Sequence, residues 1–310
     1  STDVFNNRAY GGSASGGGIS FESPDTNTLS VSAQSLFRGN TAAESGGGIS
    51  AVSSGDVRIT GTVFLSNQAQ GGEGYGGGVH AVVDSVFIEN CLFDDNQAGS
   101  TGGAVAIMQL ESSSMLRGVV ASNNRAVYAG GMSLTGEVGL QNCVIDKNSA
   151  IKDAGGVLFV GSGITSITMR QTALTQNTAT DGSGGGMVVR HGDAAFEDGT
   201  LFEANVATNL GGGLFISGSA GIKNYWRMST ATFRKNGALK GGGFATQSLV
   251  HNFVSHTSGT GRPILLFNAV RFPLGATNIP DMHHVLLDNG VYRLTAPSGG
   301  NSDERGLVRS

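Results

Sequence analysis

The sequence predicts an all-β protein, a parallel β-helix in which short coils stack as a solenoid, on three observations. A phrase of about 29 residues recurs nine times. Each copy holds short apolar, β-branched runs with period-two alternation and no helical period, which is typical of strands. Each copy also carries a glycine block followed by an apolar residue. Because one such unit cannot bury its own apolar side, copies must stack to share a core.

An asparagine with an alanine two residues later marks every copy of the phrase. Successive asparagines are 24 to 33 residues apart. Stacking would align their side-chain amides, which both donate and accept, and Asn tolerates the left-handed backbone of a corner. We therefore expect an asparagine ladder at one corner of the coil, with the alanine where the coil narrows. Its members are Asn7, Asn40, Asn67, Asn96, Asn124, Asn148, Asn177, Asn205 and Asn236.

The position three residues before each ladder asparagine is apolar, and we call it the Phe column. We expect it to point inward and to form a stack along the core. The aromatic members are Phe37, Phe64, Phe93, Phe202 and Phe233. Val4, Ala121, Ile145 and Leu174 fill the same position in the other copies.

Glycine is abundant, with 51 residues, but it lacks the every-third spacing of collagen. Two or three glycines follow each asparagine-alanine pair, as in Gly46 to Gly48. Glycine allows positive φ and close approach of two backbones. We therefore expect stacked, ordered turns at a second corner, not flexible linkers.

The position four residues before each asparagine is also mostly apolar. Strict alternation would turn it outward if the Phe column points inward. We favour a kink that turns this column inward. The alternative is an outward apolar stripe that serves as a partner surface, with Leu36, Leu92 and Leu201 as possible lateral contacts. The whole column reads Leu36, Val63, Leu92, Val120, Val144, Ala173 and Leu201.

The phrase is lost near the C-terminus, which divides the chain into two parts. Residues 1–247 form the predicted β-helix of about nine regular coils. Residues 248–310 hold four of the five prolines and four of the six histidines. We expect this part to be divergent C-terminal coils, a cap or the start of a following segment. Since repeats begin at once, we also expect the chain to be a piece of a longer protein.

Composition excludes several classes of function. A net charge of −4 without a Lys/Arg cluster argues against nucleic-acid binding. No apolar run approaches the ~20 residues of a membrane-spanning helix, so we expect no transmembrane segment in this chain. Cys91 and Cys143 share one phase two repeats apart, which places their Cα atoms ~10 Å apart, beyond disulfide reach. We expect both to be small buried apolar side chains.

A search for catalytic residues finds none, and we expect no cofactor and no metal. In the column two before each asparagine the acids Asp94, Asp146 and Glu203 never fall in neighbouring coils, whereas acid–base catalysis needs two carboxylates close together. The other acids lie in variable turns and are expected to be solvated. His80 should alternate outward as a surface side chain. The tail histidines could form a metal cluster only if the tail folds suitably; they are His251, His256, His283 and His284.

Together the motifs F-x-x-N and G-G-A-[ILV] resemble the repeats of the chlamydial polymorphic outer-membrane proteins. Similar repeats occur in other bacterial and some algal surface proteins. Phe37 to Asn40 matches the first motif, and Gly102-Gly103-Ala104-Val105 matches the second. The resemblance covers residues 4–244. It implies a right-handed parallel β-helix exposed on a cell surface, used in adhesion and carried by an autotransporter barrel.

Three hypotheses of function follow. The leading one is a non-enzymatic extracellular or cell-surface β-helix that acts as an adhesin or as a rigid structural stalk. Its partner would be a host-cell or matrix receptor. The first alternative is a structural subunit of an extracellular filament, which binds other copies of itself through strand edges or the apolar stripe. The second is a polysaccharide-active enzyme with its site in the tail or the turns.

Overall fold

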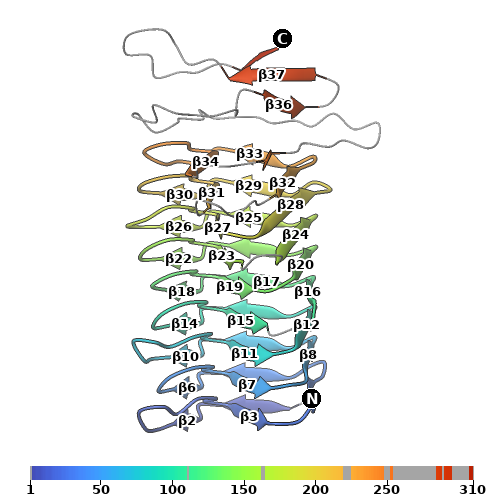
Figure 1. Cartoon of the computed structure of the whole chain (residues 1–310). Coiled ribbons are helices and arrows are strands. Elements are labelled where there is room, and N and C mark those ends of the chain that lie inside the picture. Colours follow the sequence, from blue (N-terminus) through green and yellow to red (C-terminus); the bar gives the residue numbers. More distant parts are fainter. Residues whose placement is uncertain are drawn as a thin grey trace.

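The computed structural model of the chain is a column of nine stacked coils (Figure 1). The structure describes residues 2–109, 112–161, 165–218 and 225–247, and the backbone of four short strands beyond them. Every strand pairing between successive coils is parallel. The predicted all-β solenoid is therefore confirmed.

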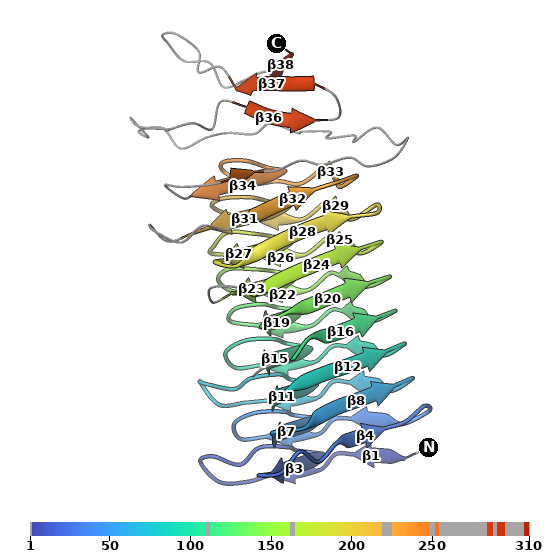
Figure 2. The same ribbon diagram turned by 45° about the vertical axis from the view of Figure 1, so that its right-hand side comes forward.

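Each coil contributes one strand to each of four sheets, here named A to D; Figure 2 shows the strands of sheet D side by side. Sheet A contains β1 (Asp3–Phe5), β5 (Leu36–Arg38), β9 (Val63–Leu65), β13 (Leu92–Asp94), β17 (Val120–Ser122), β21 (Val144–Asp146), β25 (Ala173–Thr175), β29 (Leu201–Glu203) and β33 (Thr232–Arg234). Sheet B contains β2 (Arg8–Ala9), β6 (Thr41–Ala42), β10 (Gln68–Ala69), β14 (Gln97–Ala98), β18 (Arg125–Ala126), β22 (Ser149–Ala150), β26 (Thr178–Ala179) and β30 (Val206–Ala207).

The two remaining sheets have longer strands. Sheet C contains β3 (Ile19–Ser23), β7 (Ile49–Ser53), β11 (Val79–Val83), β15 (Val105–Gln109), β19 (Met132–Thr135), β23 (Val157–Val160), β27 (Met187–Arg190), β31 (Leu214–Ser217) and β34 (Phe244–Gln247). Sheet D contains β4 (Leu29–Val31), β8 (Asp56–Thr60), β12 (Ser85–Glu89), β16 (Ser114–Arg117), β20 (Val138–Gln141), β24 (Ser166–Arg170), β28 (Asp193–Glu197), β32 (Tyr225–Met228) and β35 (Asn252–Phe253).

The last regular coil ends with β34. Further along the chain, β36 (His284–Leu287), β37 (Gly290–Leu294) and β38 (Leu307–Arg309) form a separate antiparallel sheet. Most of the expected cap, residues 248–310, lies outside the described residues. So do His251, His256 and His283 of the expected tail cluster.

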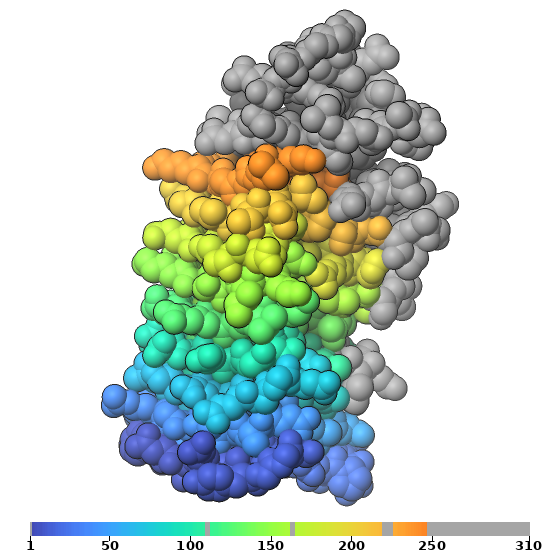
Figure 3. Space-filling model, turned by 90° about the vertical axis from the view of Figure 1, so that its left-hand side faces the viewer, coloured from blue at the N-terminus to red at the C-terminus, as the bar shows by residue number. Residues whose placement is uncertain are grey.

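Sheet B was not expected from the sequence, which suggested three strands per coil. Its strands are only two residues long and run from the residue after the ladder asparagine to the alanine of the phrase, for example Thr41–Ala42. Two residues are too few to show a period-two pattern. Figure 3 faces the side on which sheet B lies and shows the coils as bands that follow the order of the sequence.

The Phe column points inward, as predicted. All five phenylalanines are at most 1 % exposed, and neighbouring rings stack with centroids 5.0 Å apart for Phe37–Phe64 and 4.6 Å for both Phe64–Phe93 and Phe202–Phe233. The middle coils continue this stack with the smaller Ala121, Ile145 and Leu174, all fully buried. Offset stacking and burial of such rings stabilise the core by several kcal/mol in total.

The asparagine ladder is also confirmed. The side-chain oxygen of Asn67 accepts from the backbone N–H of Asn40 at 3.1 Å and from its amide at 3.0 Å. The Asn67 amide in turn donates to the Phe37 carbonyl at 2.9 Å and to the Asn96 side-chain oxygen at 3.0 Å. The pattern repeats from Asn7 to Asn236. Each buried amide therefore satisfies backbone groups that a corner would otherwise leave unpaired.

The left-handed backbone lies one residue earlier than expected. The residue before the ladder asparagine has positive φ, as at Gly39 (63°), Ser66 (54°), Lys147 (53°) and Ala204 (53°). None of the nine ladder asparagines has positive φ. The hydrogen bonds of the ladder therefore explain the asparagine, and the corner before it accepts residues of several kinds.

The glycine corner has three distinct positions. The first residue has positive φ, as at Gly46 (64°), and Ala129 and Ala154 take this position in two coils. At the second, a Cβ on Gly47 would collide with backbone atoms of the next coil. At the third, a Cβ on Gly48 would lie 3.0 Å from the Phe64 ring. The glycines thus allow close coil stacking, as predicted.

Candidate functional site

The ladder residues predicted from the sequence lie inside the solenoid, except the first. Asn40, Asn67, Asn124 and Asn177 are fully buried, whereas Asn7 at the first coil is exposed. The five phenylalanines and the ladder therefore form one interior structure and present no chemical group to a ligand. Any site must be sought on the outer faces of the sheets.

The apolar column on sheet A faces outward, so the expected kink is wrong. In β13 the burial alternates regularly, with Leu92 exposed, Phe93 buried and Asp94 half-buried. Leu92, Val120 and Val144 are 37 %, 36 % and 40 % exposed. Cross-coil register aligns the whole column as one straight row, which we call the sheet A stripe: Leu36, Val63, Leu92, Val120, Val144, Ala173 and Leu201.

The acids beside the stripe have partners within the described residues. Asp94 accepts from the Ser122 hydroxyl at 2.7 Å and from the Asn123 amide at 2.8 Å. Asp146 accepts from the Thr175 hydroxyl, and Arg234 donates to Glu203 at 2.6 Å. These contacts join successive coils. The acids of this column therefore act as braces between coils, and no two of them are adjacent.

His80 is buried, contrary to the surface position expected for it. It does alternate to the outer side of sheet C, but turn residues cover it, and its ring stacks on Tyr75 with centroids 5.7 Å apart. Only 8 % of His80 is exposed, and neither ring nitrogen has a hydrogen-bond partner. Burial lowers the pKa of His80 to about 4. On the same side of the sheet, Leu158, Val188 and Phe215 form a second small core outside the coil.

The two cysteines occupy a hydrogen-bonding column at the corner between sheets D and A. Both are buried and free, as expected, but they are more than apolar fillers. The Cys143 thiol donates to the Leu116 and Gln141 carbonyls at 3.4 Å, as the Thr172 hydroxyl does to Leu140 and Arg170 one coil later. Burial raises the pKa of Cys91 to about 11 and that of Cys143 above its ordinary value. Neither thiol is therefore reactive near neutral pH.

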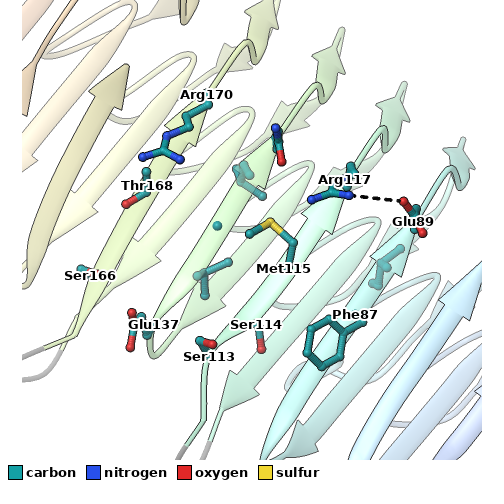
Figure 4. Close-up of a pocket in the computed structure, with 15 residues that line it drawn as sticks. Phe87, Glu89, Ser113, Ser114, Met115, Arg117, Glu137, Ser166, Thr168 and Arg170 are labelled. Atoms are coloured by element: carbon teal, nitrogen blue, oxygen red, sulfur yellow. Dashed lines mark ion pairs between the residues drawn. The ribbon is translucent and has the colours of Figure 1, made fainter. Parts of the chain in front are cut away.

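A groove on the outer face of sheet D is a well-formed pocket in the described part of the chain. It has a volume of about 550 Å³ and crosses β12, β16, β20 and β24 (Figure 4). Register aligns Phe87, Met115, Gly139 and Thr168 as one outward row. Since Gly139 has no side chain, the row is hollow at that point. The Met115 methyl group lies over the gap, 2.7 Å from where a Cβ would be.

Charged groups lie along both sides of this groove, as Figure 4 shows. At the strand ends, Arg117 and Arg170 are half-exposed and flank Gln141. Arg117 has only a long ion pair of 3.9 Å with Glu89, whereas Arg170 lies 2.9 Å from Glu197. Glu197 is nearly buried and also pairs with Arg227 of the next coil. Of the two groove arginines, Arg117 is therefore the more available to a ligand.

Glutamate and hydroxyl groups line the opposite side. Glu137 precedes β20 and is exposed, with Ser113 and Ser166 in the neighbouring coils. The groove thus combines an apolar floor, cationic groups on one edge and an acid with hydroxyls on the other. Such a mixture suits the recognition of an extended polar ligand by contacts with its faces and its charged groups.

The two glutamates of the groove are too far apart for acid–base catalysis on one bond. Glu89 lies two coils below Gln141 in the same row, and Glu137 lies four residues before Gln141. Strand and coil spacings place the two at about 16 Å, well beyond the ~5–9.5 Å of glycosidase carboxylate pairs. Among the described residues, no group of three or more His, Cys, Asp and Glu could hold a metal ion.

Comparison with known families supports the coil architecture. The family model described as "right handed beta helix region" matches residues 27–236. The chain belongs to this family. The β-helix is therefore right-handed, as expected, since parallel crossover connections take that hand. No curated protein matches it, and no solved structure does. The described residues include no helix long and apolar enough to cross a membrane.

The groove was missed at the sequence level, although two signals were present. Gly139 lies inside the strand segment Val138–Gln141, where glycine weakens a strand and often marks a close approach or a gap. The spacing is also constant, because Phe87, Met115, Gly139 and Thr168 each lie nine residues before a ladder asparagine. Alignment on the asparagines would have placed the gap between Met115 and Thr168. The path of the Met115 side chain over that gap depends on packing and has no signal in the sequence.

Proposed function

We propose that this β-helix is a non-enzymatic, extracellular surface protein, in which a rigid coil column presents an adhesive groove on sheet D. The groove of Phe87, Met115, Gly139, Arg117 and Arg170 carries the proposal, because it is a built hollow that the fold does not need. Inward rows keep one residue type from coil to coil. The rows around the groove change at every coil, as expected of a surface used for recognition.

Two further features support a surface role. The repeats resemble those of the polymorphic outer-membrane proteins, whose β-helical passengers serve in adhesion at the cell surface. Nine coils at one strand spacing each extend about 43 Å, which suits a stalk that holds a binding face away from its anchor. The inert state of Cys91 and Cys143 and the wide separation of Glu89 and Glu137 favour binding over catalysis.

A binding experiment tests the groove. The protein is applied to cultured host cells, matrix proteins and a panel of neutral and acidic glycans, and retention is measured. Gly139→Leu should fill the hollow and reduce retention at least tenfold, because the only close neighbour is the flexible Met115 end. Gly72→Leu is the matched control, since nothing lies within 4 Å of a Cβ there. Equal retention of the two variants would contradict the groove as the adhesive site.

A second measurement tests the absence of enzymatic activity. The protein is incubated with acidic and neutral polysaccharides, and new reducing ends and unsaturated products are measured. We expect neither product to exceed the level of a heat-denatured sample. Bond cleavage that is lost in Glu137→Gln or Glu89→Gln would overturn the non-enzymatic proposal and favour a polysaccharide-active enzyme.

A further inference from the structure

The sheet A stripe bears on a different question, the partner of the outer face of sheet A. Seven successive coils place an apolar side chain at the same outward position, and the row is straight because cross-coil register holds throughout. Such a face repeats every ~4.8 Å, the spacing of parallel strands. A surface with the same repeat matches it best, and another copy of this chain has that repeat.

We propose that two copies of the β-helix associate face to face through sheet A, antiparallel to each other, about a two-fold axis at Val120. Val120 lies in the fifth of nine coils and is the midpoint of the stripe from Leu36 to Leu201. Rotation about an axis that runs along the strands reverses the coil order and keeps each row opposite the same row. Leu36 then faces Leu201 of the second copy, and Leu92 faces Val144.

Charge complementarity favours this antiparallel order. In the row beside the stripe, the exposed Arg38 of the second coil faces Glu203 of the eighth, and the exposed Phe5 of the first faces Arg234 of the ninth. At the following corner, Asp95 faces Lys147. Symmetry makes each of these attractive pairs occur twice. Polar Asp3 and Thr232, which flank the stripe in its own row, also face each other.

One pair of like charge is opposed, Asp94 with Asp146. Each carboxylate already accepts hydrogen bonds from its own copy, from Ser122 and Asn123 or from Thr175 and Lys147. A parallel arrangement about an axis along the column would be worse, because every coil would face itself. Leu36 would still meet Leu36, but the pairing of Arg38 with Glu203 and of Asp95 with Lys147 would be lost.

The area is sufficient for a specific but modest dimer. Sheet A, from the left-handed corner before each strand to the one after it, is five residue steps wide, or about 17 Å. Nine coils give about 43 Å, so the flat face measures about 700 Å² on each copy. A standard stable interface buries about 800 Å² on each partner. The exposed fractions of Phe5, Leu92 and Val144, between 37 % and 45 %, show the apolar area available.

Association is tested by sedimentation equilibrium over protein concentrations from about 1 µM to 1 mM, a range that spans modest affinities. The wild-type chain should shift from monomer to dimer. Leu92→Asp should weaken dimerisation at least tenfold, and so should Val144→Asp. Because these two positions face each other, Leu92→Lys combined with Val144→Asp should restore it. Met108→Asp, on the outer face of sheet C and 45 % exposed, is the matched control and should not change it.

Single cysteine variants test the geometry. In the antiparallel dimer only Val120 faces its own copy, so Val120→Cys should form a disulfide dimer on mild oxidation, whereas Leu36→Cys or Leu201→Cys alone should not. A mixture of Leu36→Cys and Leu201→Cys should cross-link. Cys91 and Cys143 are buried and should not contribute.

Three results would overturn the proposal: a monomer at every concentration, dimers unaffected by Leu92→Asp, or self-cross-linking of every stripe variant, which indicates a parallel pair. Circular dichroism of each variant shows whether it keeps the fold. Glycan or cell binding by the groove on sheet D is a separate readout. Failure of that binding leaves the sheet A dimer unaffected, and loss of the dimer leaves the groove accessible.

Discussion

The two faces of sheet A are built from the same three-residue strands, yet their side chains follow different rules. Inside, Phe64 stacks on Phe37 and on Phe93, so each side chain must fit copies of itself one coil above and below. Outside, Arg38 is followed by Leu65, Asp94 and Ser122 in one row. The comparison shows that coil stacking constrains the interior rows, and that the exterior rows are free to carry recognition.

The largest expected effect breaks an interior row. Asn124→Ala removes the acceptor for the Asn96 backbone N–H and amide, and the donor to the Phe93 carbonyl. Since each buried group left unpaired costs about 1–3 kcal/mol, we expect a loss of roughly 3–5 kcal/mol, measured by urea denaturation. Asn7→Ala is the matched control at the exposed end of the ladder and should cost about 1 kcal/mol or less. Equal losses would show that the ladder does not stabilise the fold.

A pH titration sharpens the distinction between outer position and exposure, because His80 is outward but covered. Its pKa is about 4 in the fold against 6.5 when exposed. The unfolded chain therefore binds a proton between these values while the folded chain does not, so stability falls as the pH drops from 6.5 to 4. At about 1.4 kcal/mol per pKa unit the loss is roughly 3 kcal/mol.

His80→Leu should remove this part of the pH dependence, measured as the denaturation midpoint at pH 7 and at pH 4.5. Carboxylates will contribute a background that is common to both proteins. An unchanged difference between the two pH values would contradict the buried, neutral state of His80.

A smaller effect is expected where two rows inside the coil compensate each other. Ala104 takes the third glycine position, and the next residue in the Phe column is Ala121, both fully buried. Elsewhere this pair is glycine and phenylalanine, and a Cβ on Gly78 would lie 2.8 Å from the Phe93 ring. Ala121→Phe alone should therefore cost about 1–3 kcal/mol through overpacking.

Adding Ala104→Gly should recover part of that loss, measured as a coupling free energy in a double-mutant cycle. The same Ala104→Gly change in the wild-type background is the control and should not stabilise. Strict additivity of the two changes would show that these rows do not meet.

The smallest expected effect lies at an exterior corner. Ala204 has φ of 53°, a conformation that costs an L-residue about 1 kcal/mol. Ala204→Gly should raise stability by about 0.5 kcal/mol, since the larger freedom of glycine in the unfolded chain offsets part of the gain. The thermal midpoint measures it. Ala51→Gly, a fully buried strand position, is the opposite case and should destabilise.

Most of the interior could be predicted from the sequence, because identical side chains recur in one phase wherever coils touch. The direction of the Leu36 to Leu201 column was not predicted, since an outward apolar row contradicts the usual preference for burial. The prediction for His80 was wrong for the converse reason: the turns that cover sheet C differ in length and have no period. The groove depends on Gly139 lying between Met115 and Thr168, a relation that appears only when the strands of sheet D are aligned with one another.

The asparagine ladder has a direction. Each side-chain oxygen points toward the preceding coil and each amide nitrogen toward the following one, from Asn7 to Asn236. The dipoles of strands largely cancel across a sheet, but these amide dipoles all add. The column therefore carries a net dipole along its axis, negative toward the first coil and positive toward the last, as an α-helix does with the opposite sign. A longer array of such coils would increase it with every repeat.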